Sequence, residues 1–356
     1  MANKILTLVK NINKPLERFL LVNGWNYRLY KKKKSGIKLK KLTKTQKQQV
    51  RDYWKKYGKR VNTDWTAYFS FANDRFDPRY IPESLYYGEV AKKLYVHGME
   101  GLHHKNVQEQ IFDAKQPKTI VRKINNFISD KDHKPISLEK AIQLCKDEPE
   151  VIIKPSTGTY GGQGIIFWKP EDGEDKLKSI LTSLNQVIVQ EVVESHQFMK
   201  SITTSTINTL RVVTLLIDGE PVLLSTLLRM GKEGSRIDGF LAGGIIAVVN
   251  KNGYLEESAV QLDQTVRTQH DSGFVFKDKK VPSYNKLIDD AFRQHSRIPY
   301  FKMVSWDYAI DKVGDPILIE ANIPTGQIDF HQINIGPIFG EYTDRVLDYV
   351  YKGKEL

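Results

Sequence analysis

The stretch Ser305–Asn322, SWDYAIDKVGDPILIEAN, places three oxygen-bearing side chains at the ends of two short apolar runs. The Gly-Asp-Pro turn at 314–316 joins these runs and predicts an antiparallel hairpin. Because side chains alternate along a strand, Glu320 and Asn322 share one face, and the pairing brings Asp307 beside them. Two carboxylates and an amide oxygen suit Mg²⁺, which prefers oxygen ligands. An ordinary surface hairpin with scattered acidic residues is the alternative.

A glycine-rich stretch, KPSTGTYGGQG (154–164), begins with a lysine at the end of a predicted strand, Val151–Lys154. Glycine lets backbone N–H groups approach phosphate oxygens closely, and Lys154 adds a mobile cation for the same negative charge. The stretch is not a Walker A loop, because the lysine precedes the glycines and a strand follows them. It predicts phosphate contact only when it is read together with its neighbours.

Three further features lie between the glycine-rich stretch and the hairpin. The strand Val187–Val193 ends in polar residues that could read the edge of a nucleobase. Arg211 and Arg229 lie at the ends of two predicted strands, where guanidinium groups could reach carboxylate or phosphate oxygens. A second glycine-containing loop, GFLAGG (239–244), offers another close approach of backbone to a ligand.

The order of these features resembles the ATP-grasp superfamily. The stretch INTLRVVT (207–214), Gly243-Gly244, His331-Gln332 and Gly336-Pro337 are similar to the sugar-transfer-associated ATP-grasp branch, whose members accompany surface polysaccharide biosynthesis. The resemblance covers about residues 118–350. It implies an α+β fold in which two subdomains clasp ATP, preceded here by a helical, basic cap.

The resemblance also implies roles for individual residues. Arg211 and Arg229 would be catalytic, and Asp307, Glu320 and Asn322 would hold one or two Mg²⁺ ions. ATP would be bound by Lys123 (or its neighbour Arg122), Lys154, Gly158, Gly161, Gly162, Gln190, Glu191 and Val193. One departure is Asp238-Gly239, where the family pattern has Asp-Asn, and this puts a metal or substrate contact at Asp238 in doubt. His331 is either a base, a substrate contact or a structural histidine.

The implied reaction joins a carboxylate to an amine. ATP phosphorylates the carboxylate, and the amine then displaces phosphate to form an amide; a hexuronate sugar and an amino acid or amine are the expected partners by analogy. Two alternatives stay open. One is an ATP-grasp kinase that phosphorylates a hydroxyl acceptor, and the other is a non-catalytic nucleotide-binding protein at a membrane surface.

Local patterns divide the chain further. Tight Asp-Gly and Asn-Gly turns predict hairpins of Leu210–Ile217 with Val222–Leu228 and of Ile245–Val249 with Tyr254–Leu255. A helix is expected over Ser137–Lys146 and another near Asn285–His295. The expected parts are a basic amphipathic arm (1–45), an aromatic-rich helical cap (46–117), ATP-grasp subdomain 1 (118–200) and ATP-grasp subdomain 2 (201–350).

The positive charge of the chain is concentrated at its N-terminus. Residues 1–60 contain nineteen Lys or Arg and only two acids, Glu17 and Asp52, so they carry +17 while the rest carries −5. An amphipathic segment followed by Lys31–Lys34 can bind an anionic membrane, and a solvated arm packed on the body is the equal alternative. Nucleic acid is disfavoured as a partner, because no reading motif occurs and the body is acidic.

The single cysteine, Cys145, excludes an intrachain disulfide and a Cys-rich zinc site. It lies on a predicted amphipathic helix and is expected to pack rather than to react. No apolar run is long enough to span a bilayer, and no signal peptide is recognisable. We therefore expect a cytoplasmic protein, with peripheral attachment at the inner membrane face as the variant that the basic arm suggests.

Overall fold

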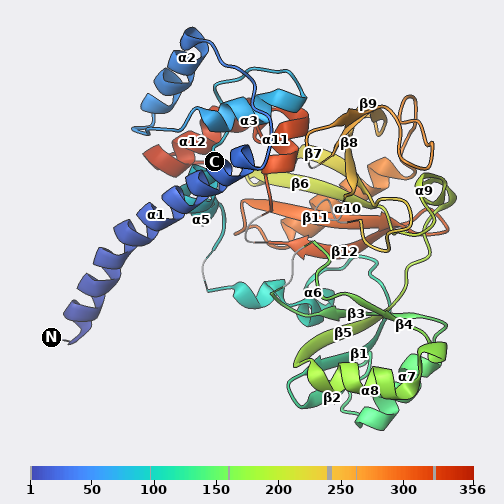
Figure 1. The fold of residues 1–356 in the computed structure, drawn as a ribbon. Coiled ribbons are helices and arrows are strands. Elements are labelled where there is room, and N and C mark those ends of the chain that lie inside the picture. The colour runs from blue at the N-terminus through green and yellow to red at the C-terminus, as the bar shows by residue number, and fades with distance from the viewer. Residues whose placement is uncertain (1, 97, 159–160, 239–242, 262, 324–325) are drawn as a thin grey trace.

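A computed structural model describes residues 2–96, 98–158, 161–238, 243–261, 263–323 and 326–356, with only the backbone described for residues 2–15 and 100. Two antiparallel sheets lie one above the other, and a helical N-terminal part covers the second sheet (Figure 1). Helix α6 (Lys105–Ile111) contacts strands of both sheets and lies at their junction. The mixed α+β architecture expected from the sequence is confirmed.

The first sheet has the strand order β2-β1-β5-β3-β4, and every neighbouring pair is antiparallel. Its strands are β1 (Thr119–Ile124), β2 (Phe127–Ser129), β3 (Val151–Pro155), β4 (Ile166–Trp168) and β5 (Gln186–Glu191). Helices α7 (Leu138–Lys146) and α8 (Glu174–Ser183) pack against it. Ser137 caps α7 by accepting a hydrogen bond from the Lys140 amide. Cys145 is fully buried in this core, which confirms the packing role.

The second sheet has the order β10-β9-β8-β7-β6-β11-β12 and is antiparallel throughout. Its strands are β6 (Thr209–Ile217), β7 (Glu220–Met230), β8 (Ile245–Val249), β9 (Leu255–Gln261), β10 (Val266–Arg267), β11 (Met303–Ile310) and β12 (Pro316–Asn322). The three predicted hairpins are confirmed. The accompanying helices are α9 (Gln197–Ile202), α10 (Tyr284–Ser296), α11 (Asp329–Ile335) and α12 (Thr343–Lys352).

The N-terminal part consists of α1 (Ala2–Lys34), α2 (Lys44–Lys55), α3 (Asp64–Ala72), α4 (Glu83–Leu85), a π-helical turn (Tyr86–Val90) and α5 (Ala91–Leu94). The N-terminal end of α1 projects away from the body (Figure 1). Among the described residues, no helix combines the length and the apolar character that crossing a bilayer requires.

Aromatic side chains of the cap pack against the second sheet and the C-terminal helix. Trp54 is fully buried in a core that includes Leu215 of β6 and Leu347 of α12. The hydroxyl groups of Tyr53 and Tyr57 both donate to Asp344 at the start of α12, at 2.7 and 2.8 Å. These contacts tie the N-terminal and C-terminal ends of the chain into one core.

Helix α1 is held to the body mainly through one of its faces. Leu29 is 1% exposed and packs in a cluster with Trp65, Phe69 and Ile333. Gly88 leaves room for Val22, since a Cβ atom there would lie 3.2 Å from a Val22 methyl carbon. The C-terminal half of α1 is therefore part of the body and not a separate arm.

We expect Leu29→Ala to lower the free energy of unfolding by about 2–5 kcal/mol, because it removes buried methyl groups and leaves a cavity. The matched variant is Leu20→Ala on the same helix, where the side chain is 61% exposed. That change is expected to alter stability by less than about 0.5 kcal/mol. Urea unfolding of both variants measures the difference, and equal midpoints would show that α1 is not anchored in this way.

Candidate active site

One large cavity, of about 630 Å³, lies where the two sheets and the cap meet. The first sheet contributes Ile152, Lys154, Phe167 and Glu191 to its wall, and the second contributes Arg211, Arg229, Asp307 and Glu320. The cap and α11 close one end of it with Trp25, Lys32, Glu83, Tyr87 and Asp329. The cavity therefore joins residues from both sheets, the cap and α11.

The register of three neighbouring strands sets the charged row in this cavity. Arg211 of β6 lies opposite Asp307 of β11, and Asp307 lies opposite Glu320 of β12. The Asn322 amide donates to an Asp307 carboxylate oxygen at 3.4 Å. The structure thus brings together the three residues predicted as metal ligands, on the face of the sheet that lines the cavity.

Asp307 is held by two guanidinium groups. Arg211 binds it with two hydrogen bonds, and an Arg229 nitrogen lies 3.2 Å from its second oxygen. Burial by itself would raise the pKa of Asp307, but the two arginines outweigh burial and lower this pKa below its usual value. Asp307 is therefore a carboxylate at neutral pH. Glu320 forms its own ion pair, with Lys105 at 3.0 Å.

The oxygen atoms of these three side chains fit a Mg²⁺ ion whose remaining ligands come from a bound phosphate or from water. Asp307, Glu320 and Asn322 supply two carboxylates and an amide, which are hard oxygen donors. Within the described ranges, no three His, Cys, Asp or Glu side chains form a metal-binding group by themselves. An ion held here would need further oxygens from phosphates or water, as Mg²⁺ commonly does.

Lys154 lies on the opposite wall, on the first sheet. Its ammonium donates to the Gln190 side chain at 3.0 Å. Burial lowers the pKa of Lys154 to about 8; Glu320 opposes this shift and Lys105 adds to it. A buried lysine that has one neutral partner is poised to bind an anion, which would restore the charged form.

The glycine-rich loop reaches the cavity through Gly161 and Gly162. Gly162 has a φ of +79°, and a Cβ atom there would lie 2.4 Å from a methyl carbon of Ile237. Only glycine fits such a close approach without displacement of Ile237. Gly158 also has a positive φ but does not line the cavity, and residues 159 and 160 lie outside the described residues.

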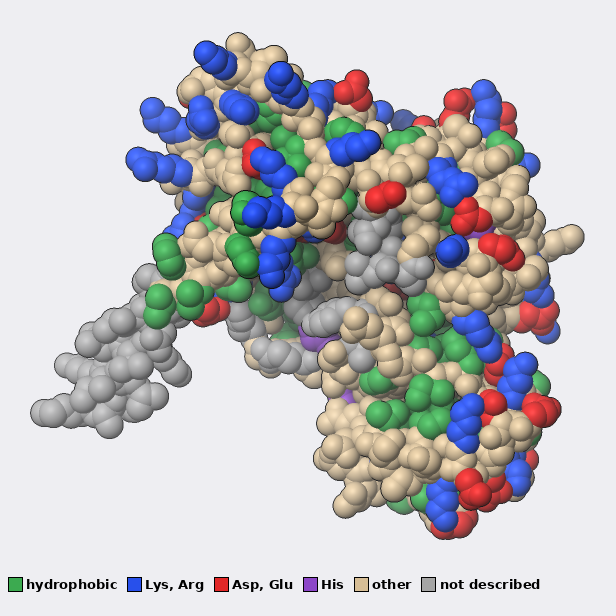
Figure 2. Space-filling model, in the orientation of Figure 1, with side chains coloured by type: hydrophobic (Ala, Val, Ile, Leu, Met, Phe, Trp, Pro, Cys, Tyr) green, Lys and Arg blue, Asp and Glu red, His purple; other side chains and the backbone are tan. Residues whose placement is uncertain are grey.

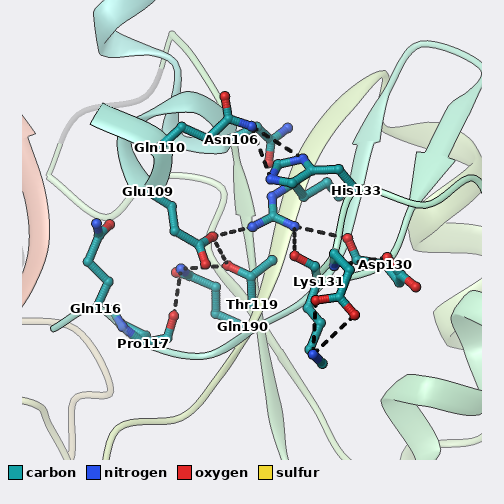
Figure 3. Close-up of polar contacts among 12 residues, drawn as sticks. Asn106, Glu109, Gln110, Gln116, Pro117, Thr119, Asp130, Lys131, His133 and Gln190 are labelled. Carbon is teal, nitrogen blue, oxygen red and sulfur yellow. Dashed lines mark hydrogen bonds and ion pairs between the residues drawn. The ribbon is translucent and has the colours of Figure 1, made fainter. Parts of the chain in front are cut away.

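The wall next to Lys154 is largely apolar and includes Val193, Ile152 and Phe167, with the polar Glu191 among them. Gln190 was expected here too; it lies opposite Ile152 and bonds to Lys154, but it is not among the residues that line the cavity. Its amide donates to the Pro117 carbonyl at 3.3 Å and to the Thr119 hydroxyl at 3.4 Å (Figure 3). Gln190 therefore links the Lys154 ammonium to the start of β1 through hydrogen bonds.

The structure does not bring Lys123 to the cavity. Its ammonium donates to the carbonyls of Leu181 and Leu184, at 2.5 and 2.6 Å, at the end of α8. Its neighbour Arg122 is paired with Glu109, which also accepts a hydrogen bond from Thr119 in the polar cluster of Figure 3. Both cations are therefore used in packing α6 and α8 against the first sheet.

Lys105 supplies the second cation that was expected from Lys123. It is the first residue of α6, and its backbone amide donates to the Ser156 carbonyl at 3.1 Å, which fixes it beside the glycine-rich stretch. The only local signal was a lysine that opens a short helix before β1. That signal is weak, because exposed lysines are common at such positions.

Two other predictions concern Asp238 and His331. Asp238 lines the cavity, accepts a hydrogen bond from Thr209 and lies 3.3 Å from Arg229, while residues 239–242 of the second glycine loop lie outside the described residues. His331 is fully buried with Nδ1 2.7 Å from the Ser225 hydroxyl. Burial and the two arginines lower the pKa of His331 well below its usual value, which favours the neutral imidazole, and His331 is not among the residues that line the cavity.

Residues 72–343 match the family described as sugar-transfer associated ATP-grasp, whereas a comparison with curated proteins finds no match. Similar solved structures include an L-amino acid ligase from Bacillus licheniformis (14% identity, 71% of this chain and 48% of that chain, TM-score 0.41). Another is D-alanyl-alanine synthetase A from Vibrio cholerae (11% identity, 71% and 65%, TM-score 0.42).

The chain spans less than two thirds of the length of either neighbour. At TM-scores of 0.41 and 0.42 these likenesses carry no argument about function, and the assignment rests on the family match. Because that match covers more than half of the chain, the resemblance seen in the sequence is confirmed, and the protein belongs to the sugar-transfer associated ATP-grasp family.

Proposed function

We propose that the protein is an ATP-dependent carboxylate–amine ligase that acts in the synthesis of a surface polysaccharide. The observation that carries this proposal is that basic side chains on one wall of the cavity face a row of charged side chains on the other wall. Lys105 and Lys154 face the charged row formed by Arg211, Asp307 and Glu320. Two lysines suit ATP phosphates, and the row suits Mg²⁺ and an acyl phosphate.

In this proposal the apolar wall near Val193 holds the adenine, and Lys154, Lys105 and the backbone at Gly161 and Gly162 contact the phosphates. Asp307, Glu320 and Asn322 would hold Mg²⁺, which neutralises phosphate charge when it is bound. Arg211 and Arg229 lie beside this group and would orient the substrate carboxylate. Such positioning and charge stabilisation require no covalent protein nucleophile.

The reaction then has two steps. A carboxylate oxygen of the acceptor attacks the γ-phosphorus of ATP, the bond to the β-phosphate oxygen breaks, and ADP leaves. An amine attacks the resulting acyl carbon, the carbon–oxygen bond to phosphate breaks, and the amine loses a proton as the amide forms. A hexuronate is the carboxylate substrate that we propose.

Glu320→Ala is expected to reduce ADP release at least about 100-fold, because it removes one of the carboxylates that would hold the Mg²⁺ ion that neutralises phosphate charge. Glu341→Ala, an exposed acid on a distant turn, is the control and should retain activity. ADP is measured with Mg²⁺, ATP, hexuronates and amines, and products are identified by mass spectrometry. An amide supports the ligase, a stable phosphorylated hydroxyl would show a kinase, and unchanged turnover in Glu320→Ala would contradict the site.

The pKa of Lys154, about 8, predicts the pH dependence of nucleotide binding. Burial favours the neutral amine, so above pH 8 the free protein loses the positive charge that phosphate binding requires. The affinity for Mg·ATP should therefore fall as pH rises through 8, by up to about tenfold per pH unit. Lys154→Arg, which stays charged, should remove this dependence in a calorimetric titration. An equal decrease in both proteins would assign it to another group.

We also propose that α1 attaches the protein to an anionic membrane. Leu16, Phe19, Leu20, Tyr27 and Tyr30 fall on one face of α1 at the helical repeat and are at least half exposed, which defines an outward apolar stripe. Lys31, Lys33 and Lys34 are exposed beside its C-terminal end. Figure 2 shows apolar side chains on α1 next to basic side chains of the cap. Each basic residue close to such a surface contributes about 1 kcal/mol.

The triple variant Leu16→Ser, Phe19→Ser, Leu20→Ser is expected to lower binding to phosphatidylserine vesicles at least about tenfold, because it removes the apolar contacts. Vesicle co-sedimentation at low and high salt is the measurement, with phosphatidylcholine vesicles as a control. Deletion of residues 1–45 is a poorer test, because it also removes Leu29 and the cavity residue Trp25. Equal binding by the wild type and the triple variant would contradict membrane attachment through this stripe.

A further inference from the structure

The end of the cavity that the cap closes carries charges of both signs. Arg28 and Lys32 come from α1, Glu83 from the start of α4, and Asp329 from the start of α11. Lys32 lies 3.5 Å from an Asp329 oxygen and 3.1 Å from the Tyr68 hydroxyl. These four charged residues, which we call the cap-end cluster, play no part in the binding of ATP proposed above.

Glu83 is the unexplained member of the cluster. Its side chain lines the cavity, the residue is 2% exposed, and no described group donates a hydrogen bond to its buried Oε2. Burial and the nearby Asp329 raise the pKa of Glu83 to about 8, against the opposing effects of Lys32 and Arg28. A buried carboxyl oxygen without a partner is costly, so an absent hydrogen-bond donor is the simplest physical explanation.

Arg28 is a positively charged hydrogen-bond donor, whereas Glu83 is an acceptor. Its guanidinium carbon lies 4.3 Å from the centre of the Trp25 ring, and Trp25 stacks on Tyr87 with 4.2 Å between ring centres. This stacking holds Arg28 at the cavity wall, while no described carboxylate lies within ion-pair distance of it. Arg28 is exposed and lines the cavity, and its guanidinium fork matches the geometry of a carboxylate.

The cluster lies beside the charged row of the proposed active site. Phe330 follows Asp329 directly, and its ring centre is 5.8 Å from the Arg211 guanidinium carbon. Both groups line the same cavity. A ligand at the cap-end cluster could therefore present a reactive group to an acyl phosphate held near Arg211.

We propose that the cap-end cluster binds the amine substrate and that this substrate is an amino acid. Glu83 accepts hydrogen bonds from its amine, and Arg28 binds its carboxylate. This inference rests on the proposed ligase function and adds the chemical class of the second substrate. A plain amine would leave Arg28 unused, and a sugar ring would find the Trp25 ring already covered by Tyr87 and Arg28.

The test measures binding and not turnover. Wild-type protein is saturated with Mg²⁺ and a non-hydrolysable ATP analogue, and pools of free proteinogenic amino acids are added while ligand-detected NMR and calorimetry follow binding. At least one amino acid should bind. Its N-acetyl derivative and its amide should each bind at least about tenfold more weakly, because each lacks one of the two charged groups.

Two variants locate the site. Glu83→Gln keeps the shape but cannot become a carboxylate when an amine binds, and Arg28→Met keeps much of the stem and removes the guanidinium. Each should weaken amino-acid binding by about 10- to 100-fold, while affinity for the ATP analogue changes by less than about twofold. Arg51→Met, at an exposed arginine of α2 in the same cap, is the matched control and should change neither affinity.

The inference is overturned if wild-type protein loaded with the ATP analogue binds no amino acid, or if both variants bind the amino acid as tightly as wild type does. Failure of the proposed function looks different, because wild-type protein would then not bind the ATP analogue at all. Glu83→Gln is expected to fold, since the amide has nearly the shape of the carboxyl and burial already favours the uncharged form of Glu83.

Discussion

The buried carboxylate of Asp307 is the constraint on which the cavity depends. It lies between Arg211 and Arg229, on a strand whose other neighbour carries Glu320. Removing charges from water costs several kcal/mol per ion, and good geometry repays this cost only in part. Such a group is weak evidence for stability. Asp307 and its two arginines are better understood as a preorganised group of charges beside which phosphate and Mg²⁺ would bind. Lys105 and Lys154 lie on the opposite wall of the cavity.

Helix α1 connects this site to the outside of the molecule through its two faces. One face carries Leu29 into the core and places Arg28 and Lys32 in the cavity, while the other exposes Leu16 and Leu20. A single rigid helix would thus couple membrane attachment to the end of the cavity that we assign to the amine substrate. The cap is therefore part of the proposed site, although the family resemblance in the sequence began only near residue 118.

Local patterns were sufficient to predict the hairpin at 305–322 and two further hairpins of the second sheet, β6 with β7 and β8 with β9. A tight turn sets the register of the two strands, and the two-residue alternation sets which side chains share a face. Asp307, Glu320 and Asn322 could therefore be placed together. Local patterns did not predict the position of Lys123, which was expected to contact ATP. The pairing of β1 with β5 is irregular between Thr119 and Val121, and Lys123 faces α8. A shift of one residue in a strand reverses the side to which a side chain points.

The sequence by itself determined the fold class, the family and the charged row, because these depend on short-range spacing and on the order of motifs along the chain. Tertiary structure alone decided that Lys105 faces Glu320, that His331 is a buried neutral histidine, and that Glu83 meets Arg28, Lys32 and Asp329 at one end of the cavity. Glu83 and Asp329 are almost 250 residues apart. Such meetings depend on how helices pack against a sheet, and no local pattern encodes them.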